Sequence, residues 1–155
     1  MNENNPLTIR EATSEDLPAV LRLYNQVDGD EDMSIDVQAA EAIFAKIASY
    51  PDYKVYVAEL KNEIIGTFTL LIMDNMTHGG STSGVIESVV VTKALQGQGI
   101  GKQMMEYAIE RCQEKNCYKA TLSSNMKRVD AHKFYERIGF KSHGRSFLTE
   151  LKDTD

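Results

Sequence analysis

Three glycines fall within five residues, at positions 97, 99 and 101, and the residues around them limit the fold more than any other feature. Before them, the β-branched run at 85–91 predicts a buried strand. After them, a helix ending near Asn116 is predicted by apolar residues at helical spacing, namely Ile100, Met104, Met105, Ala108, Ile109 and Cys112. Residues 118–123 predict a further strand. Such a strand–helix–strand unit places its two strands parallel, with a right-handed crossover.

A first strand at 7–11, two helices and an antiparallel hairpin are predicted upstream of this unit. Ser14 can cap the first helix, whose apolar face carries Leu17, Val20, Leu21 and Tyr24. The apolar side of the second helix carries Ala39, Ala40, Ile43, Phe44 and Ile47. Strands at 53–59 and 64–73 flank a turn at 61–63, which predicts the hairpin.

A short helix and a last strand are predicted downstream. The helix has Ala131, Phe134, Tyr135 and Ile138 on one side and stops at Gly139, and the strand covers 147–151. The order β-α-α-β-β-β-α-β-α-β predicts a mixed α/β (α+β) fold. Its sheet should be mostly antiparallel, with a central parallel strand–helix–strand unit and helices on both faces. The length of 155 residues suits one domain, 1–155.

Composition narrows the classes of function. The net charge of −6 argues against general nucleic-acid binding, which needs a basic surface. No apolar run is long enough to span a membrane, and residues 1–6 lack the plan of a signal peptide, so we expect a cytoplasmic protein without a membrane partner. Two cysteines and three scattered histidines give no zinc spacing, and the acidic stretch 28–32 lacks the glycine and glutamate of an EF-hand, so no metal is expected. A homodimer is compatible with the sequence, which does not fix the oligomeric state.

The glycine loop is suited to bind an anion, because backbone N–H groups converge at the start of a helix whose dipole adds positive charge. A pyrophosphate is the natural ligand, and a tight turn without a ligand is the alternative. A P-loop is excluded, since Gln96 replaces its first glycine and Gln103 its Ser/Thr. A dinucleotide fingerprint fails because Lys102 stands at its third glycine.

The pattern Q/R-x-x-G-x-G/A is met by Gln96, Gly99 and Gly101. Together with the strand 86–91 and the F-Y-x-x-x-G-F sequence at 134–140, it resembles the GNAT superfamily of N-acetyltransferases. Residues 122–135 are similar to the aminoalkylphosphonate N-acetyltransferases. The start of the strand at 86–87 and residues 117–119 are similar to the glucosamine-6-phosphate N-acetyltransferases.

The resemblance implies acetyl-CoA as cosubstrate and a small-molecule primary amine as acceptor, with an aminoalkylphosphonate or an amino-sugar phosphate as candidates. The main chain of Val89, Val90 and Val91 would hold the pantetheine arm and polarise the thioester. The pyrophosphate would lie on the glycine loop, which comprises Gln96, Gly97, Gln98, Gly99, Ile100, Gly101 and Lys102. A CoA-binding regulatory or sensor module without turnover is the alternative function.

Two side chains are the candidates for acid–base catalysis. Tyr135 would protonate the departing thiolate, and its alternative role is packing. On a regular strand Glu87, Val89 and Val91 share one face, which would place the Glu87 carboxylate within an apolar strand along the line of the thioester as the base. Its alternative roles are an ion pair or orientation of the amine.

One position departs from the family pattern. Many members carry asparagine seven residues before the motif tyrosine, where this chain has Arg128. Either Asn125 substitutes for that asparagine, or Arg128 meets a CoA phosphate or an anionic group of the substrate; a solvated surface arginine is the alternative. By the resemblance, the acidic stretch 28–32 borders the acceptor pocket, where it would attract an ammonium group and repel a phosphonate.

Overall fold

The computed structural model describes residues 6–28 and 34–151. The chain divides into two compact units, Met1–Leu122 and Ser123–Asp155, which are described in turn. The single domain expected from the length stays a prediction. None of the described helices is long and apolar enough to cross a membrane.

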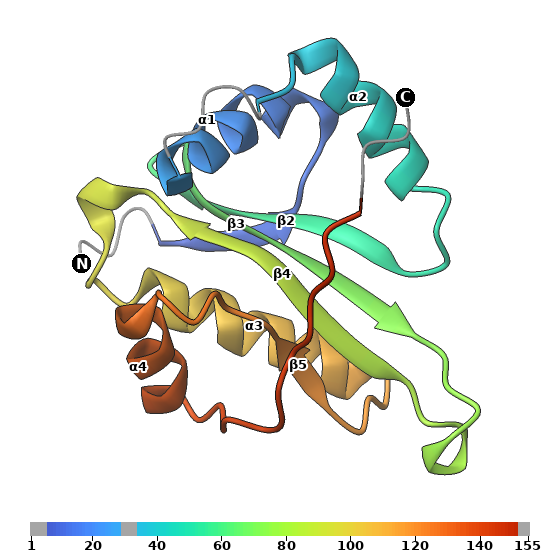
Figure 1. The fold of residues 1–155 in the computed structure, drawn as a ribbon. Helices are drawn as coiled ribbons and strands as arrows, with labels where there is room; N and C mark the ends of the chain where they lie inside the picture. The colour runs from blue at the N-terminus through green and yellow to red at the C-terminus, as the bar shows by residue number, and fades with distance from the viewer. Residues whose placement is uncertain (1–5, 29–33, 152–155) are drawn as a thin grey trace. The chain divides into compact units, whose positions relative to one another are not determined.

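The described residues of the first unit form one five-stranded sheet, with the strands in chain order (Figure 1). The strands are β1 (Thr8–Glu11), β2 (Tyr53–Leu60), β3 (Glu63–Met73), β4 (Ser83–Val91) and β5 (Ala120–Leu122). The first four pair antiparallel, and β4 pairs parallel with β5. Both the predicted hairpin and the predicted parallel unit are therefore confirmed.

Helices cover both faces of this sheet, as predicted (Figure 1). They are α1 (Leu17–Asp28) and α2 (Val37–Ile47) on one face and α3 (Ile100–Glu114) on the other. The α3 face holds the most deeply buried packing, in which Phe68, Met104 and Met105 are fully buried. Gly66 permits this packing, because a Cβ there would lie 2.7 Å from the Met104 sulfur.

The second helix buries less of its apolar side than its sequence pattern indicates. Ala40 is buried, but Ile43 is 48% exposed.

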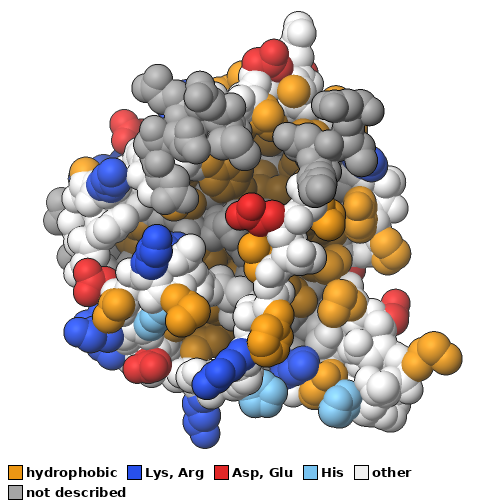
Figure 2. All heavy atoms as spheres, in the orientation of Figure 1, with side chains coloured by type: hydrophobic (Ala, Val, Ile, Leu, Met, Phe, Trp, Pro, Cys, Tyr) orange, Lys and Arg blue, Asp and Glu red, His pale blue; other side chains and the backbone are white. Residues whose placement is uncertain are grey.

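Figure 2 shows hydrophobic side chains interspersed with charged ones over the face in view, and the acidic side chains among its described residues are scattered singly. The acidic stretch 28–32 lies outside the described residues, apart from the backbone of Asp28 at the end of α1.

The second unit contains α4 (Val129–Arg137), which ends as predicted: Ile138 is the C-cap and Gly139 follows with a φ of 105°. The strand predicted at 147–151 is wrong, because these residues have no strand conformation. A strand is stabilised only through pairing. Here no ladder forms, and Phe147 and Leu148 are 92% and 87% exposed.

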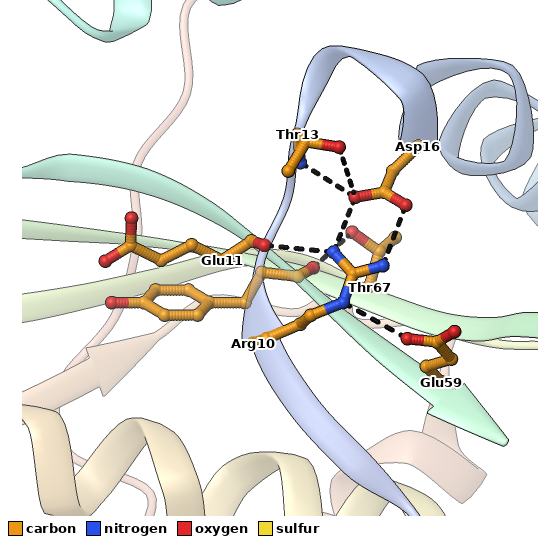
Figure 3. Close-up of polar contacts among 7 residues, drawn as sticks. Arg10, Glu11, Thr13, Asp16, Glu59 and Thr67 are labelled. Atoms are coloured by element: carbon orange, nitrogen blue, oxygen red, sulfur yellow. Dashed lines mark hydrogen bonds and ion pairs between the residues drawn. The ribbon is translucent and has the colours of Figure 1, made fainter. Parts of the chain in front are cut away.

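An ion-pair network joins β1, β2 and the start of the first helical segment (Figure 3). The Arg10 guanidinium donates to both carboxylate oxygens of Asp16, at 2.7 and 3.0 Å, and to Glu59 at 3.1 Å. Asp16 also accepts from the Thr13 backbone N–H at 2.7 Å. Thr13, not the predicted Ser14, is therefore the N-cap, because the 3₁₀ turn η1 (Ser14–Asp16) begins one residue earlier than expected.

The Arg10 guanidinium, which donates two hydrogen bonds to Asp16, lowers the pKa of that carboxyl. A lowered folded-state pKa stabilises the fold above the unfolded value of about 3.9, and the stabilisation is lost as pH falls through the folded value. We predict that Asp16→Asn lowers the free energy of unfolding near pH 7 by about 1–2 kcal/mol, a modest loss because Arg10 is partly solvated. Urea unfolding should show this gap narrowing below about pH 4. A gap of equal size at both pH values would contradict this role for the ion pair.

Candidate active site

A β-bulge interrupts β4 at Ser88. Thr69 pairs with Glu87 and Thr67 with Val90, so two steps along β3 correspond to three along β4. Ser88 has a φ of 52°, the left-handed conformation that the first residue of a G1-type bulge adopts and that glycine usually occupies. The bulge could not be predicted from local sequence, because a serine stands where a glycine would have marked it.

The bulge overturns the predicted orientation of Glu87, Val89 and Val91. Residues directly opposite in an antiparallel pair lie on the same face, and so do residues two apart along a regular strand. Because Thr67 and Thr69 are two apart on β3, their partners Val90 and Glu87 share a face. Val91, opposite Gly66, lies on the other one.

The face that carries Glu87 is the one covered by α1, where Tyr24 lies beside Thr67. Glu87 is exposed, not enclosed in an apolar strand as expected, whereas Val90 is only 8% exposed. The backbone carbonyl of Glu87 is fixed by the Thr69 hydroxyl, which donates to it at 3.1 Å. Because the side chain of Glu87 is exposed, its carboxylate is accessible to a bound ligand.

One edge of β4 is open next to the bulge. The strand β5 pairs with Gly84, Val85 and Ile86 and then ends at Leu122. Within the described part of the first unit, no strand continues alongside 87–91 on that side. Within the first unit, the backbone groups of Val89 and Val90 that point to this edge and the Val91 N–H are thus left for a ligand, whereas the Val91 carbonyl accepts from the Gln96 side chain.

The glycine loop follows β4 through the 3₁₀ turn η4 (Lys93–Leu95). Gly97 and Gly99 have φ values of 83° and 82°, and Gly99 is the N-cap of α3. A Cβ at either glycine would meet nothing within 4 Å, so the loop needs glycine for its conformation and leaves open space in front of it. The first amides of α3, from Ile100 onward, have no acceptor within the helix and carry the positive end of its dipole.

Two polar side chains of the loop, those of Gln96 and Lys102, contact the protein. Gln96 donates from Nε2 to the Val91 carbonyl at 3.1 Å. The Lys102 ammonium lies 3.6 Å from Glu106, one turn along α3. Since Gly97, Gly99 and Gly101 have no side chains and Ile100 is buried, the loop presents its backbone N–H groups together with the exposed side chain of Gln98.

The second unit holds the remaining candidates at the start of α4. Asn125 accepts from the Lys127 N–H at 2.9 Å through its side chain, and its carbonyl accepts from the Arg128 N–H at 3.0 Å and from His132 Nε2 at 2.8 Å. These contacts close a turn that brings Asn125 and Arg128 together. The turn also ties His132, which the motif did not single out as a site residue, to this group.

Tyr135 lies on α4 between two aromatic rings, those of Phe134 and Phe140. Burial raises the pKa of the Tyr135 phenol, and the positive charge of Arg128 opposes that rise. A phenol with a raised pKa keeps its proton throughout the neutral range. Tyr135 is therefore a proton donor at neutral pH.

The acetyltransferase (GNAT) family model matches residues 15–140 of this sequence. The chain belongs to this family. It is accordingly an acetyltransferase with acetyl-CoA as cosubstrate, as the sequence predicted.

Two relatives narrow the kind of acetyltransferase it resembles. The aminoalkylphosphonate N-acetyltransferase of Salmonella typhimurium is 33% identical over 138 residues, which cover 88% of this chain and 87% of that enzyme. The glucosamine 6-phosphate N-acetyltransferase of Trypanosoma brucei brucei is 36% identical over 98 residues. That match spans 63% of this chain and 65% of the trypanosomal enzyme, just under two thirds of its length.

A solved structure from Bacillus halodurans C-125, described as a transcriptional regulator, has the same fold. Its TM-score is 0.86 at 30% identity, over 94% of this chain and all of that one. A putative acetyltransferase from Agrobacterium tumefaciens str. C58 also has this fold, with a TM-score of 0.87 at 32% identity over 93% of this chain and 99% of that one.

The bulge can be tested through the backbone conformation of Ser88. A β-branched residue is strained at positive φ, so we predict that Ser88→Val lowers the free energy of unfolding by about 1–2 kcal/mol. Ser88→Gly is the matched control. It should be at least as stable as the wild type, because glycine adopts this φ freely. Urea unfolding measures both variants. A Ser88→Val variant as stable as the wild type would mean that β4 is regular at this position.

Proposed function

We propose that this chain transfers the acetyl group of acetyl-CoA to the primary amine of a small molecule, acting as a single cytoplasmic domain without a nucleic-acid partner. The observation that carries the proposal is the continuity of the open edge of β4 with the glycine loop. One segment, 87–102, combines free strand backbone, an accessible carboxylate and a helix N-terminus. An elongated ligand with a pyrophosphate near one end and a thioester at the other suits such a segment.

The thioester arm would lie along the open edge at Val89, Val90 and Val91. Backbone N–H groups there would hydrogen-bond the pantetheine amides and the thioester carbonyl, stabilising the oxyanion that forms on attack by the amine. The pyrophosphate would accept from the amides of 98–102. Fixed backbone donors suit this task, because they need no reorganisation when charge develops.

Glu87 is the proposed base, acting on the substrate ammonium directly or through a water. Its exposed carboxylate lies directly before the bulge residue Ser88, and the strand edge where the thioester would bind follows at 89–91. An ammonium next to a carboxylate is also held electrostatically, so the same group would orient the amine. Loss of the ammonium proton gives the amine the lone pair with which it attacks the carbonyl carbon.

Tyr135 is the proposed general acid toward the CoA thiolate. When the tetrahedral intermediate collapses, the carbon–sulfur bond breaks and the sulfur takes the electron pair. The protonated phenol can then donate its proton to that sulfur. Burial raises the pKa of this phenol and nearby Arg128 opposes the rise, so the proton that the role requires is present at neutral pH.

The acceptor is proposed to carry an anionic head group, as an aminoalkylphosphonate or an amino-sugar phosphate does. Arg128 supports this proposal, since its planar fork can pair with two oxygens of a phosphonate, and Lys127 and His132 lie in the same turn. Both relatives reported above are named for such substrates. The acidic stretch 28–32 favours a purely cationic amine instead, so the substrate class needs a direct comparison.

A regulatory module that binds CoA without turnover is the second candidate, favoured by the relative described as a transcriptional regulator. The deciding experiment measures thiol release from acetyl-CoA with a panel of amines. We expect turnover with aminoethylphosphonate or glucosamine 6-phosphate and little with polyamines or aminoglycosides. Turnover of the polycations alone would overturn the anionic acceptor, and CoA binding without any turnover would favour the regulator.

Gly99→Glu tests the cofactor loop. The glutamate would bring a side chain and a negative charge to the place proposed for the pyrophosphate, so we predict loss of CoA binding by at least about 100-fold. Isothermal titration calorimetry measures the affinity. Gly99→Ala, which introduces only the backbone strain, should lose much less. If a folded Gly99→Glu protein binds CoA with unchanged affinity, the pyrophosphate does not bind at this loop.

Tyr135→Phe tests the acid. We predict that kcat falls about 10- to 1,000-fold while the affinity for acetyl-CoA is nearly unchanged, because only proton donation is lost. Tyr118→Phe, at a tyrosine that is 39% exposed in the first unit, is the matched control and should keep full activity. Steady-state and single-turnover rates measure both. A single-turnover rate in Tyr135→Phe equal to that of the wild type would show that this tyrosine only packs.

A further inference from the structure

Two glutamines hold the connection between β4 and the glycine loop. Gln96 binds back to the end of β4 through the Val91 carbonyl. Gln26, on α1, reaches the same connection from another layer of the fold. Its Oε1 accepts from the Lys93 backbone N–H at 3.1 Å and from the Thr92 hydroxyl at 3.3 Å.

The contact from Gln26 supplies a cap that the connection lacks locally. Lys93 is the first residue of η4, and the first N–H groups of a helical turn have no acceptor inside it. Thr92, at the N-cap, does not cap the turn with its own side chain, and its hydroxyl donates to Gln26 instead. The capping oxygen therefore comes from a residue 67 positions earlier in the chain.

We infer that Gln26 is a positioning residue for acetyl-CoA, an inference that rests on the proposed role of the glycine loop. The open edge of β4 would bind the pantetheine arm and the amides of 98–102 the pyrophosphate, two groups that are covalently joined in one ligand. The connection that Gln26 caps lies between these two parts of the site and sets their separation. With the cap lost, the connection samples other positions, and the loop amides meet the pyrophosphate in only a fraction of the molecules.

Gln26→Leu removes the acceptor and keeps the size of the side chain. We expect the Kd and KM for acetyl-CoA to rise about tenfold, as for the loss of two modest hydrogen bonds, with kcat within about twofold of the wild type. Gln26→Glu keeps an oxygen that can accept both bonds and should restore both constants to near wild-type values. Gln113→Leu, at an exposed glutamine of α3, is the matched control and should change neither constant.

Calorimetry and steady-state kinetics decide among the outcomes. An unchanged Kd in Gln26→Leu, or a Gln26→Glu variant as weak as Gln26→Leu, would overturn the positioning role. If Gln26→Leu does not fold, Thr92→Val gives a second measurement, because it removes one of the two donors; about a threefold rise in Kd is expected and no rise would contradict the inference. A wild-type protein that binds no CoA would overturn the proposed function itself.

Discussion

The extra residue of β4 at Ser88 determines which side chains face which layer of the molecule. Before the bulge, Ile86 is buried opposite Leu70, and beyond it Val90 is buried opposite Thr67 on the α1 face. The strand keeps its pairing with β3 across the bulge, while β5 pairs only before it. Exposure of Glu87 and the open edge therefore occur at the same point of the strand.

The position of the glycine loop depends on how firmly α3 is attached to the sheet. Ile100, in the first turn, is 6% exposed, and Met104 packs over Gly66. At the other end, the Cys117 N–H donates to the Cys112 carbonyl at 2.9 Å, with Asn116 in the left-handed conformation, which is a Schellman motif. A helix fixed at both ends holds its first amides in a constant place, as a pyrophosphate site requires.

Periodicity and turn chemistry predicted most of the fold, because the buried faces of helices and strands require apolar residues at characteristic spacings in the sequence. The helix end at Gly139 and the hairpin turn at 61–63 followed from such local rules. Local rules failed where pairing decides the outcome, as in 147–151, which were predicted as a strand but have no partner strand. The Thr13 N-cap could have been found, since Thr13 and Asp16 have the spacing of a capping box.

The glycine loop of the candidate site was predictable because glycine marks its backbone conformation directly. The bulge was not predictable, since nothing in the sequence distinguishes Ser88, which has a positive φ, from a serine in a regular strand. Gln26 was not predictable either, because its contacts with Thr92 and Lys93 join segments far apart in the chain. Such long-range hydrogen bonds have no local sequence pattern.

Residues 89–102 are proposed to form one continuous acetyl-CoA site. Titration of CoA into ¹⁵N-labelled protein, followed through the backbone amide resonances, tests it most directly. We expect saturable shifts concentrated at the amides of 89–91 and 98–102, with small shifts along α2. Saturable CoA binding that leaves both groups of amides unshifted would contradict it.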